Sequence, residues 1–196
     1  MTTLAVARSE VASSKPAAWW GMATLIATEA TIFAILIASY LFLRASSPAW
    51  PQGGITPPDL KLALPFSFVL WGSSIPLVLA ERAITRGRIN AVRAGLLVSA
   101  LMGLAFLGAT LADFRALDFG WRDNAYASAF YTLVGLHATH VAIGVAMNAV
   151  VQLKAWLGKL TPERHLTLTV FSMYWHFVDA VWVAVFPVAY LSAHVR

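Results

Sequence analysis

Hydrophobic residues in this chain are gathered into five long runs that short polar segments separate. The runs cover about residues 17–43, 60–84, 92–112, 125–153 and 166–191. Each run meets or exceeds the roughly 20 residues that an α-helix needs to cross the hydrocarbon core of a bilayer. The pattern therefore predicts an all-α, polytopic membrane protein built as a bundle of five transmembrane helices.

The segments between the runs have the composition of loops and turns. Residues 45–59 hold four prolines and two glycines, residues 85–91 form a short basic turn, and residues 113–124 and 154–165 carry charge. Inside the second run, Gly72, Ser73, Ser74 and Pro76 predict a proline kink. Residues 1–15 are polar and predict a flexible cytoplasmic tail, followed by a single transmembrane domain over residues 16–196.

Composition supports a membrane rather than a soluble protein. The chain is 59% hydrophobic and 12% charged, whereas soluble domains average about 45–50% apolar and about 25% charged residues. Because it has no cysteine, it can form neither a disulfide nor a thiolate-ligated metal site. Its net charge of +5 comes from basic residues at the ends of the runs, where they face lipid head groups, so we expect no nucleic-acid partner.

The distribution of lysine and arginine predicts the orientation in the membrane. The tail, the second connector and the fourth connector, with the helix ends beside them, hold Arg8, Lys15, Arg82, Arg86, Arg88, Arg93, Lys154, Lys159 and Arg164. The opposite side holds Arg44, Lys61, Arg115, Arg122 and Arg196. Since basic residues are enriched on the cytoplasmic side, we expect the N-terminus in the cytoplasm and the C-terminus outside.

Small residues recur every fourth position on two of the predicted helices. One stripe is formed by Gly95, Ser99 and Gly103, and the other by Ala138, Ala142 and Ala146. Small side chains let transmembrane helices approach closely, so both stripes are predicted packing faces.

Five ionisable residues lie inside the predicted spans: Glu29, His137, His140, His176 and Asp179. Each such residue costs at least about 2.5–3.5 kcal/mol at the bilayer centre on insertion scales. With a rise of about 1.5 Å per residue, four of them fall near one depth, and the fifth, His137, lies one turn from His140. His137 with His140, and His176 with Asp179, share a helix face because their spacing is i,i+3.

Three interpretations of this polar layer remain open from the spacing alone. Two histidines on facing helices are able to ligate a b-type haem. A layer of carboxyl and imidazole groups is also able to relay protons, as in pumps and transporters. The third interpretation is a polar clasp that ties the helices together.

Three segments, in order along the chain, resemble motifs of a known family. Residues 174–182 read YWHFVDAVW, residues 135–144 read GLHATHVAIG, and the first run contains WGM at 20–22 and EATIF at 29–33. They are similar to the motifs of subunit III of the haem–copper oxidases. Over about residues 20–190 the chain resembles the short, five-helix bacterial form, which lacks the first two helices of the long form.

The resemblance implies a non-catalytic subunit of an aerobic respiratory complex that couples oxygen reduction to proton pumping. Catalytic, cofactor-binding and metal-ligating residues are expected to be absent from this chain, because the family's haem and copper lie in partner subunits I and II. Subunit III is expected to pack beside subunit I, to bind phospholipid and to support proton uptake and stability. The implied location is the inner membrane of a bacterial cell, where other respiratory-complex subunits are further expected partners.

The family's functional residues carry over to single positions of this chain. Glu29 matches the intramembrane glutamate that reacts with carbodiimide, and His137 and His140 match the paired histidines. Lys154 and His165 match positions that are associated with a lipid head group. Thr169 departs from the pattern, since the family often has glutamate there.

Alternative functions follow from the same features. The five-helix form also occurs as subunit III of quinol oxidases and as an accessory protein of nitric oxide reductase. Outside the family, a transporter or a b-type cytochrome would also place ionisable residues inside spans. A transporter would be favoured by an inverted repeat, and we detect none in the sequence.

Overall fold

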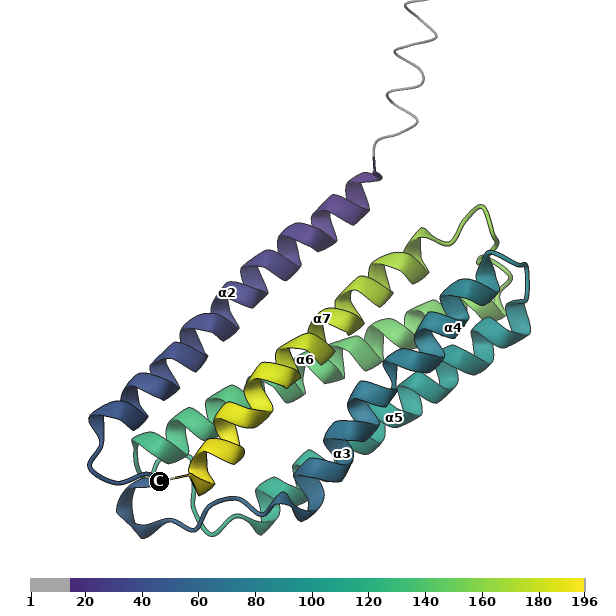
Figure 1. Ribbon diagram of the computed structural model, residues 1–196. Helices are drawn as coiled ribbons and strands as arrows, with labels where there is room; N and C mark the ends of the chain where they lie inside the picture. The colour runs from purple at the N-terminus through teal and green to yellow at the C-terminus, as the bar shows by residue number, and fades with distance from the viewer. Residues whose placement is uncertain (1–14, 196) are drawn as a thin grey trace, which may run out of the picture.

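The computed structural model describes residues 15–195, so the predicted tail lies outside the described residues except for Lys15. Along the chain, the elements are α2 (Ala17–Ser46), η1 (Gln52–Gly54), α3 (Leu60–Gly72), α4 (Ser74–Ile84), α5 (Ile89–Ala116), α6 (Ala125–Trp156), α7 (Leu166–Ala189) and η2 (Leu191–His194). Over residues 15–195 the regular structure is helical, apart from one isolated bridge between Thr161 and Arg164. Figure 1 shows the helices running lengthwise beside one another.

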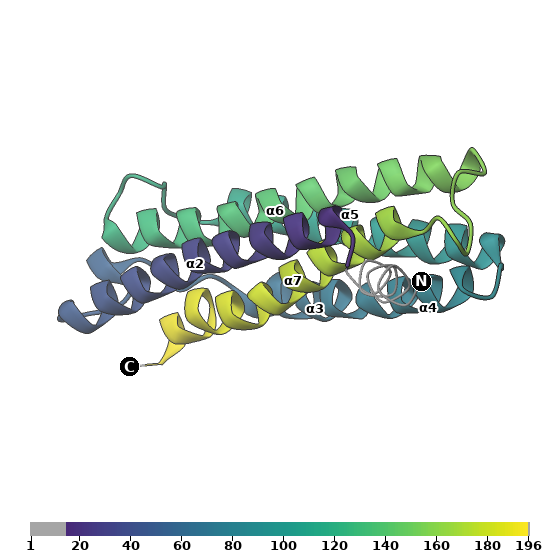
Figure 2. The ribbon, with the colours of Figure 1, turned by 90° about the horizontal axis from the view of Figure 1, so that it is seen from above.

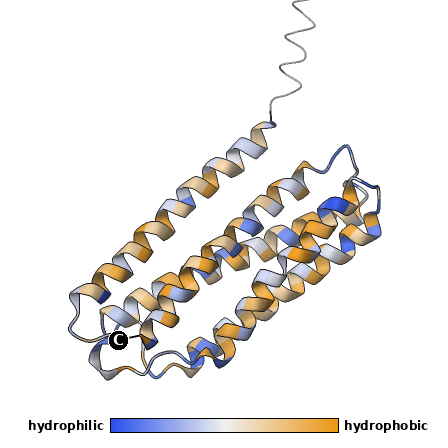
Figure 3. Cartoon of the chain, viewed as in Figure 1, coloured by the Kyte–Doolittle hydropathy of each residue, from blue (hydrophilic) through white to orange (hydrophobic). Residues whose placement is uncertain are grey.

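Five helices of the described chain are long and apolar enough to cross a membrane. These spans are Ala17–Ser46, Leu60–Ile84, Ile89–Ala116, Ala125–Trp156 and Leu166–His194. The predicted all-α class and the five predicted spans are therefore confirmed. Figure 3 shows hydrophilic residues concentrated in the loops and at the helix ends, while hydrophobic residues follow the helices.

The second span is interrupted for one residue, Ser73, between α3 and α4. The Ser73 N–H still donates to the carbonyls of Val69 (3.1 Å) and Leu70 (2.9 Å), so the backbone stays nearly helical. Three residues later, Pro76 has no N–H to donate to the carbonyl of Gly72, which weakens the helix at this point. The interruption lies in the segment from Gly72 to Pro76 for which the sequence predicts a proline kink.

Helix α5 extends beyond both ends of its predicted span, 92–112. Near its start, Arg93 donates from Nη2 to the carbonyl of Ala155 (3.0 Å). Near its end, Asp113 accepts a hydrogen bond from the Tyr190 hydroxyl (2.7 Å). Because Tyr190, just after the end of α7, satisfies Asp113, the helix continues past the apolar run at its C-terminal end, whereas Arg93 lies inside the predicted span.

The helices form a curved row with α7 in front of it. In the row, α6 packs between α2 and α5, and α5 packs against both α3 and α4. Helix α7 lies over α6, with α2 on one side and α3 and α4 on the other, as Figures 1 and 2 show. One face of α7 therefore remains open between α2 and α4.

The centre of the bundle is built on buried tryptophans of α7. The Trp175 ring packs so closely against α5 and α6 that a Cβ at Gly103 or Gly144 would lie 2.7 Å or 2.8 Å from it. Gly103 thus confirms the predicted packing face of α5. The predicted face of α6 is wrong within this chain, because Ala142 and Ala146 are exposed while Gly144 makes the close contact.

Candidate functional site

A carboxyl group and an imidazole join α2 to α6 inside the membrane-spanning region. Glu29 Oε2 lies 3.0 Å from His140 Nε2. The His140 side chain is 8% exposed and the Glu29 side chain is 25% exposed. The sequence predicts that these two residues lie at the same depth, and in the structure their side chains are in direct contact.

The second ring nitrogen of His140 determines how protons are arranged in this pair. His140 Nδ1 lies 2.8 Å from the carbonyl oxygen of Leu136, which can only accept, so Nδ1 carries a hydrogen. A neutral His140 then has a lone pair on Nε2, and Glu29 must donate its own proton to it. If both nitrogens carry hydrogen instead, Glu29 is the carboxylate. In either arrangement the pair holds one proton between two atoms.

His137 is fully buried but does not contact Glu29 through a hydrogen bond. Its Nε2 donates to the carbonyl of Val178 (3.3 Å), and its Nδ1 has no partner within the described chain. The ring stacks on Trp182, with centroids 4.5 Å apart. Its contacts thus tie α6 to α7, while His140 contacts α2.

His176 and Asp179 form a separate cluster with Ser74 of α4. Ser74 Oγ lies 2.9 Å from His176 Nδ1 and is also hydrogen-bonded to Asp179 Oδ2. Asp179 is 8% exposed, and its other oxygen, Oδ1, has no partner among residues 15–195. The single polar layer predicted from depth is therefore divided between the two flanks of α7.

Three serines of the second span bind side chains of α7, and the sequence pattern does not predict these contacts. The Trp175 indole N–H donates to Ser73 Oγ (2.8 Å), and that of Trp182 donates to Ser67 Oγ (2.8 Å). With Ser74, they form a row of hydroxyls along α3 and α4 that faces α7. The signal in the sequence is a hydroxyl residue in an apolar run. Ser73 and Ser74 contribute to the predicted kink, and Ser67 lies outside that segment.

The two predicted head-group residues lie near the junction of α6 and α7. Lys154 Nζ donates to Thr167 Oγ1 (3.0 Å), across the connector between these helices. His165 Nδ1 donates to the carbonyl of Pro162 (2.5 Å), and its ring is part-exposed. Both side chains lie at the end of the bundle that the sequence predicts to face the cytoplasm.

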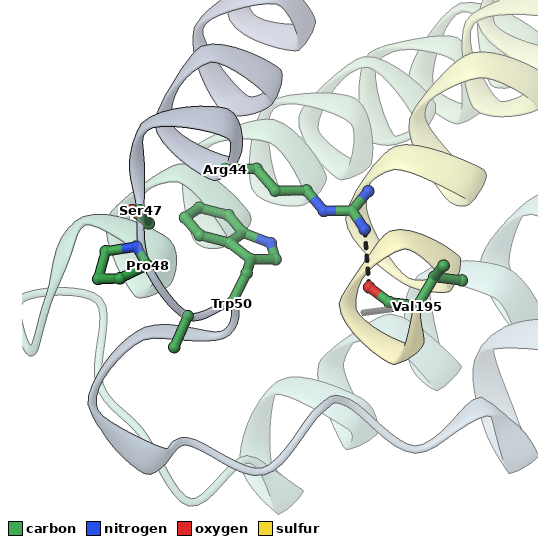
Figure 4. A pocket seen from close by; sticks show the side chains of 6 residues that line it. Arg44, Ser47, Pro48, Trp50 and Val195 are labelled. Carbon is green, nitrogen blue, oxygen red and sulfur yellow. Dashed lines mark hydrogen bonds between the residues drawn. The ribbon is translucent and has the colours of Figure 1, made fainter.

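At the opposite end, an open pocket of about 510 Å³ lies between the end of α2 and the C-terminal residues. Arg44 Nη2 donates to the carbonyl of Val195 (2.7 Å) beside Trp50, as Figure 4 shows. Arginine and tryptophan at a helix end are typical of the membrane–water boundary, where tryptophan is enriched.

The polar clusters join helices through side chains that can each bind a proton. Among residues 15–195, no group of three or more His, Cys, Asp or Glu side chains is close enough to hold a metal ion. Glu29–His140 and Asp179–Ser74–His176 each combine a carboxyl group with an imidazole. Each cluster also connects two helices that are distant in the sequence.

Comparison with known proteins gives one family and many relatives. A family model described as cytochrome c oxidase subunit III matches residues 10–194. Cytochrome c oxidase subunit 3 of Thermostichus vulcanus is 30% identical over 174 residues, which cover 87% of this chain and 85% of the relative. The subunit of the same name from Alkalihalophilus pseudofirmus is 34% identical over 167 residues, covering 83% and 81%.

A relative with a different named substrate is similar to the same degree. Cytochrome bo(3) ubiquinol oxidase subunit 3 of Pseudomonas aeruginosa is 32% identical over 175 residues, which cover 88% of this chain and 83% of the relative. The region that the family model matches, residues 10–194, includes all five spans and both carboxyl–imidazole clusters.

Proposed function

This chain belongs to the cytochrome c oxidase subunit III family and is a subunit III of a haem–copper oxidase, and from that membership we propose that it supports proton uptake and stability of the catalytic subunit without being catalytic itself. Membership implies a multi-pass membrane protein that works in a complex with other oxidase subunits. The proposed location is the inner membrane of a bacterial cell, with the N-terminus in the cytoplasm and the C-terminus outside.

The Glu29–His140 contact is the observation that carries this proposal. It holds one proton inside the membrane between two helices, at 3.0 Å, without any third ionisable ligand hydrogen-bonded to it in the described chain. Such a pair is able to buffer or pass one proton beside a neighbouring subunit. It also attaches α2, which has few other buried side chains, to the bundle.

The redox centres are proposed to lie in partner subunits. In this account, subunits I and II hold the haem and copper, and this chain packs beside subunit I with other respiratory-complex subunits as further partners. Its own residues, including His137, His140 and His176, act through hydrogen bonds rather than as haem ligands. Their imidazole nitrogens support this role, because His137 Nε2 and His140 Nδ1 bond to backbone carbonyls.

Bound phospholipid is proposed at the cytoplasmic end, beside Lys154 and His165. The Lys154 ammonium has further N–H donors besides the one that binds Thr167. A lipid phosphate offers the acceptors and the charge that these donors need. This lipid would fill space between the connector and a neighbouring subunit.

Removing and restoring this subunit tests the proposed support role. Depletion from the purified oxidase should leave the initial rate of oxygen reduction largely intact, because the catalytic centres are elsewhere. It should shorten the time for which turnover continues and should slow the proton-uptake step measured in a single turnover, without making that step rate-limiting. Added wild-type chain should restore both. Loss of the initial rate on depletion, with no effect on proton uptake, would contradict the proposal.

A quinol oxidase is the second candidate, which the similarity to the Pseudomonas aeruginosa subunit favours. The two candidates share this chain's chemistry and differ in the electron donor of the partner subunits. Oxygen consumption by the purified complex with reduced cytochrome c and with ubiquinol separates them. We expect cytochrome c to be the donor.

A further inference from the structure

The open face of α7 between α2 and α4 combines one polar group with small residues. Its outward positions are His176, Ala180, Val183 and Ala184, which are spaced by four, three and one residues and so share one side of the helix. Ala180 and Ala184 are exposed, Val183 is 57% exposed and His176 is part-exposed. We call these four positions the α7 face.

We propose that the α7 face is the surface on which a transmembrane helix of a partner subunit docks, and that His176 Nε2 donates a hydrogen bond to an acceptor oxygen of that helix. The inference rests on the proposed function, because the partner is an oxidase subunit. It adds to that function the contact surface and the chemistry that the partner must offer.

The hydrogen bonds of Asp179 determine which nitrogen of His176 carries a hydrogen. Ser74 has a single hydroxyl hydrogen, so it donates either to Asp179 or to His176 Nδ1 and accepts from the other. A carboxylate would leave Asp179 Oδ1 charged, buried and without a donor, which is costly in an apolar medium. The neutral carboxyl avoids this cost. It donates to Ser74, which donates to His176 Nδ1.

It follows that His176 Nε2 carries the hydrogen. This nitrogen has no partner among residues 15–195, yet it is not one of the buried unpartnered atoms, so it reaches the surface of the bundle. His176 lies ten residues after the start of α7, about 15 Å along the helix axis. A donor exposed there to hydrocarbon would lack an acceptor, and each such group costs several kcal/mol.

The shape beside His176 suits a helix better than a lipid head group. Ala180 and Ala184 permit a close approach of two backbones. Beside them, a shallow groove of about 320 Å³ on α4 begins at Ser74, with Ile75, Val78, Leu79 and Arg82 along it. The groove offers space for side chains of an adjacent helix, and the depth of His176 places it below the head groups. The fitting partner is thus a transmembrane helix with a hydroxyl, carbonyl or carboxyl oxygen.

Two amide substitutions separate the outward contact of His176 from its inward one. In His176→Gln, the side-chain amide reaches the position of Nε2 and keeps an outward donor. In His176→Asn, the shorter amide takes the position of Nδ1, keeps the contact with Ser74 and removes the outward donor. His176→Phe removes both. All three variants are made in the full chain and assembled in the oxidase complex.

The measurement is the rate at which this chain leaves the affinity-purified complex in detergent. His176→Gln should dissociate at a rate close to that of wild type, whereas His176→Asn and His176→Phe should dissociate about three- to twentyfold faster, the range expected for one interhelical hydrogen bond in a membrane. Unfolding midpoints of the isolated chains identify any variant that fails to fold. Equal retention of the Gln and Asn variants would overturn the inference.

Photocrosslinking locates the docked helix without altering His176. A diazirine amino acid replaces Val183 on the α7 face or, as a matched control, Val150 of α6, since these valines are 57% and 54% exposed. Position 183 should crosslink to a partner subunit and position 150 should not; the reverse result would overturn the inference. If the wild-type chain isolates with no haem-containing partner, the proposed function itself fails. If the chain co-isolates with such a partner but crosslinks only from position 150, the α7 face is rejected as the docking surface and the proposed function stands.

Discussion

Replacing Glu29 by alanine should release α2 from the bundle. Few side chains attach this helix, since only Met22, Phe33 and Tyr40 of its 30 residues are buried. Without the carboxyl group, the Nε2 atom of His140, which is 7% exposed, loses its partner. A buried polar atom left unpaired costs about 1–3 kcal/mol, which corresponds to a rise of about 5- to 150-fold in the population with α2 detached.

The attachment of α2 is measurable by cysteine labelling, because the chain has no cysteine of its own. Met22→Cys places a thiol where the native side chain is 8% exposed. A membrane-permeant maleimide should label it about 5- to 150-fold faster in the Glu29→Ala background than in the parent. Glu29→Gln should stay within about threefold of the parent, because its amide N–H donates to Nε2 of a neutral His140.

The matched control for this experiment is Thr28→Ala. Thr28 is exposed on the same helix, and its hydroxyl donates only to the carbonyl of Leu25 in α2 itself (2.7 Å). Its removal should leave the labelling rate of Cys at position 22 unchanged. The reasoning is refuted if Glu29→Ala labels at the parental rate, or if Glu29→Gln labels as fast as Glu29→Ala.

Three further predictions concern other parts of the chain. Gly103→Ala should lower the free energy of unfolding by about 1–3 kcal/mol, because its Cβ would lie 2.7 Å from an indole ring; Gly108→Ala, which meets nothing within 4 Å, should not lower the unfolding midpoint in detergent. Lys154→Ala should reduce the phospholipid phosphorus retained per complex while Lys154→Arg retains it, and equal lipid content in both would contradict the head-group role. The Lys61 backbone N–H and ammonium hold the pKa of the Asp59 carboxyl below its ordinary value of 3.8. The hydrogen bond by which the Asp59 carboxylate caps the start of α3 is therefore complete above pH 3.8, and it is lost as the pH falls through the lowered pKa. A carboxyl titration by NMR with a midpoint at or above 3.8 would disprove this.

The spans were predictable because lipid imposes a length and an apolar composition on every spanning helix. The C-terminal end of α5 was not predictable in the same way. Asp113 lies within the helix, one residue past the predicted span, because the hydroxyl of Tyr190, just after the end of α7, donates to it. A hydropathy pattern contains no information on such a partner, so the predicted span ends before this charge.

The site was predictable in depth but not in rotation about the helix axes. The positions of Glu29 and His140 along their helices predicted that they lie at the same depth, and in the structure their side chains are in direct contact. Depth also suggested one layer with His176 and Asp179. The rotation of α7, which the Trp175 and Trp182 hydrogen bonds to serines hold, instead directs that pair to Ser74.

The central claim is that this chain is a subunit of a haem–copper oxidase and that its histidines do not hold the redox centre. Affinity isolation of the tagged chain from its own membranes, followed by a reduced-minus-oxidised spectrum before and after the chain is released from the complex, tests this claim most directly. The account predicts haem and copper in stoichiometric amounts in the complex, all of which stay with the partner subunits on release. Haem that leaves with this chain, or a chain that isolates without any haem-containing partner, would contradict it.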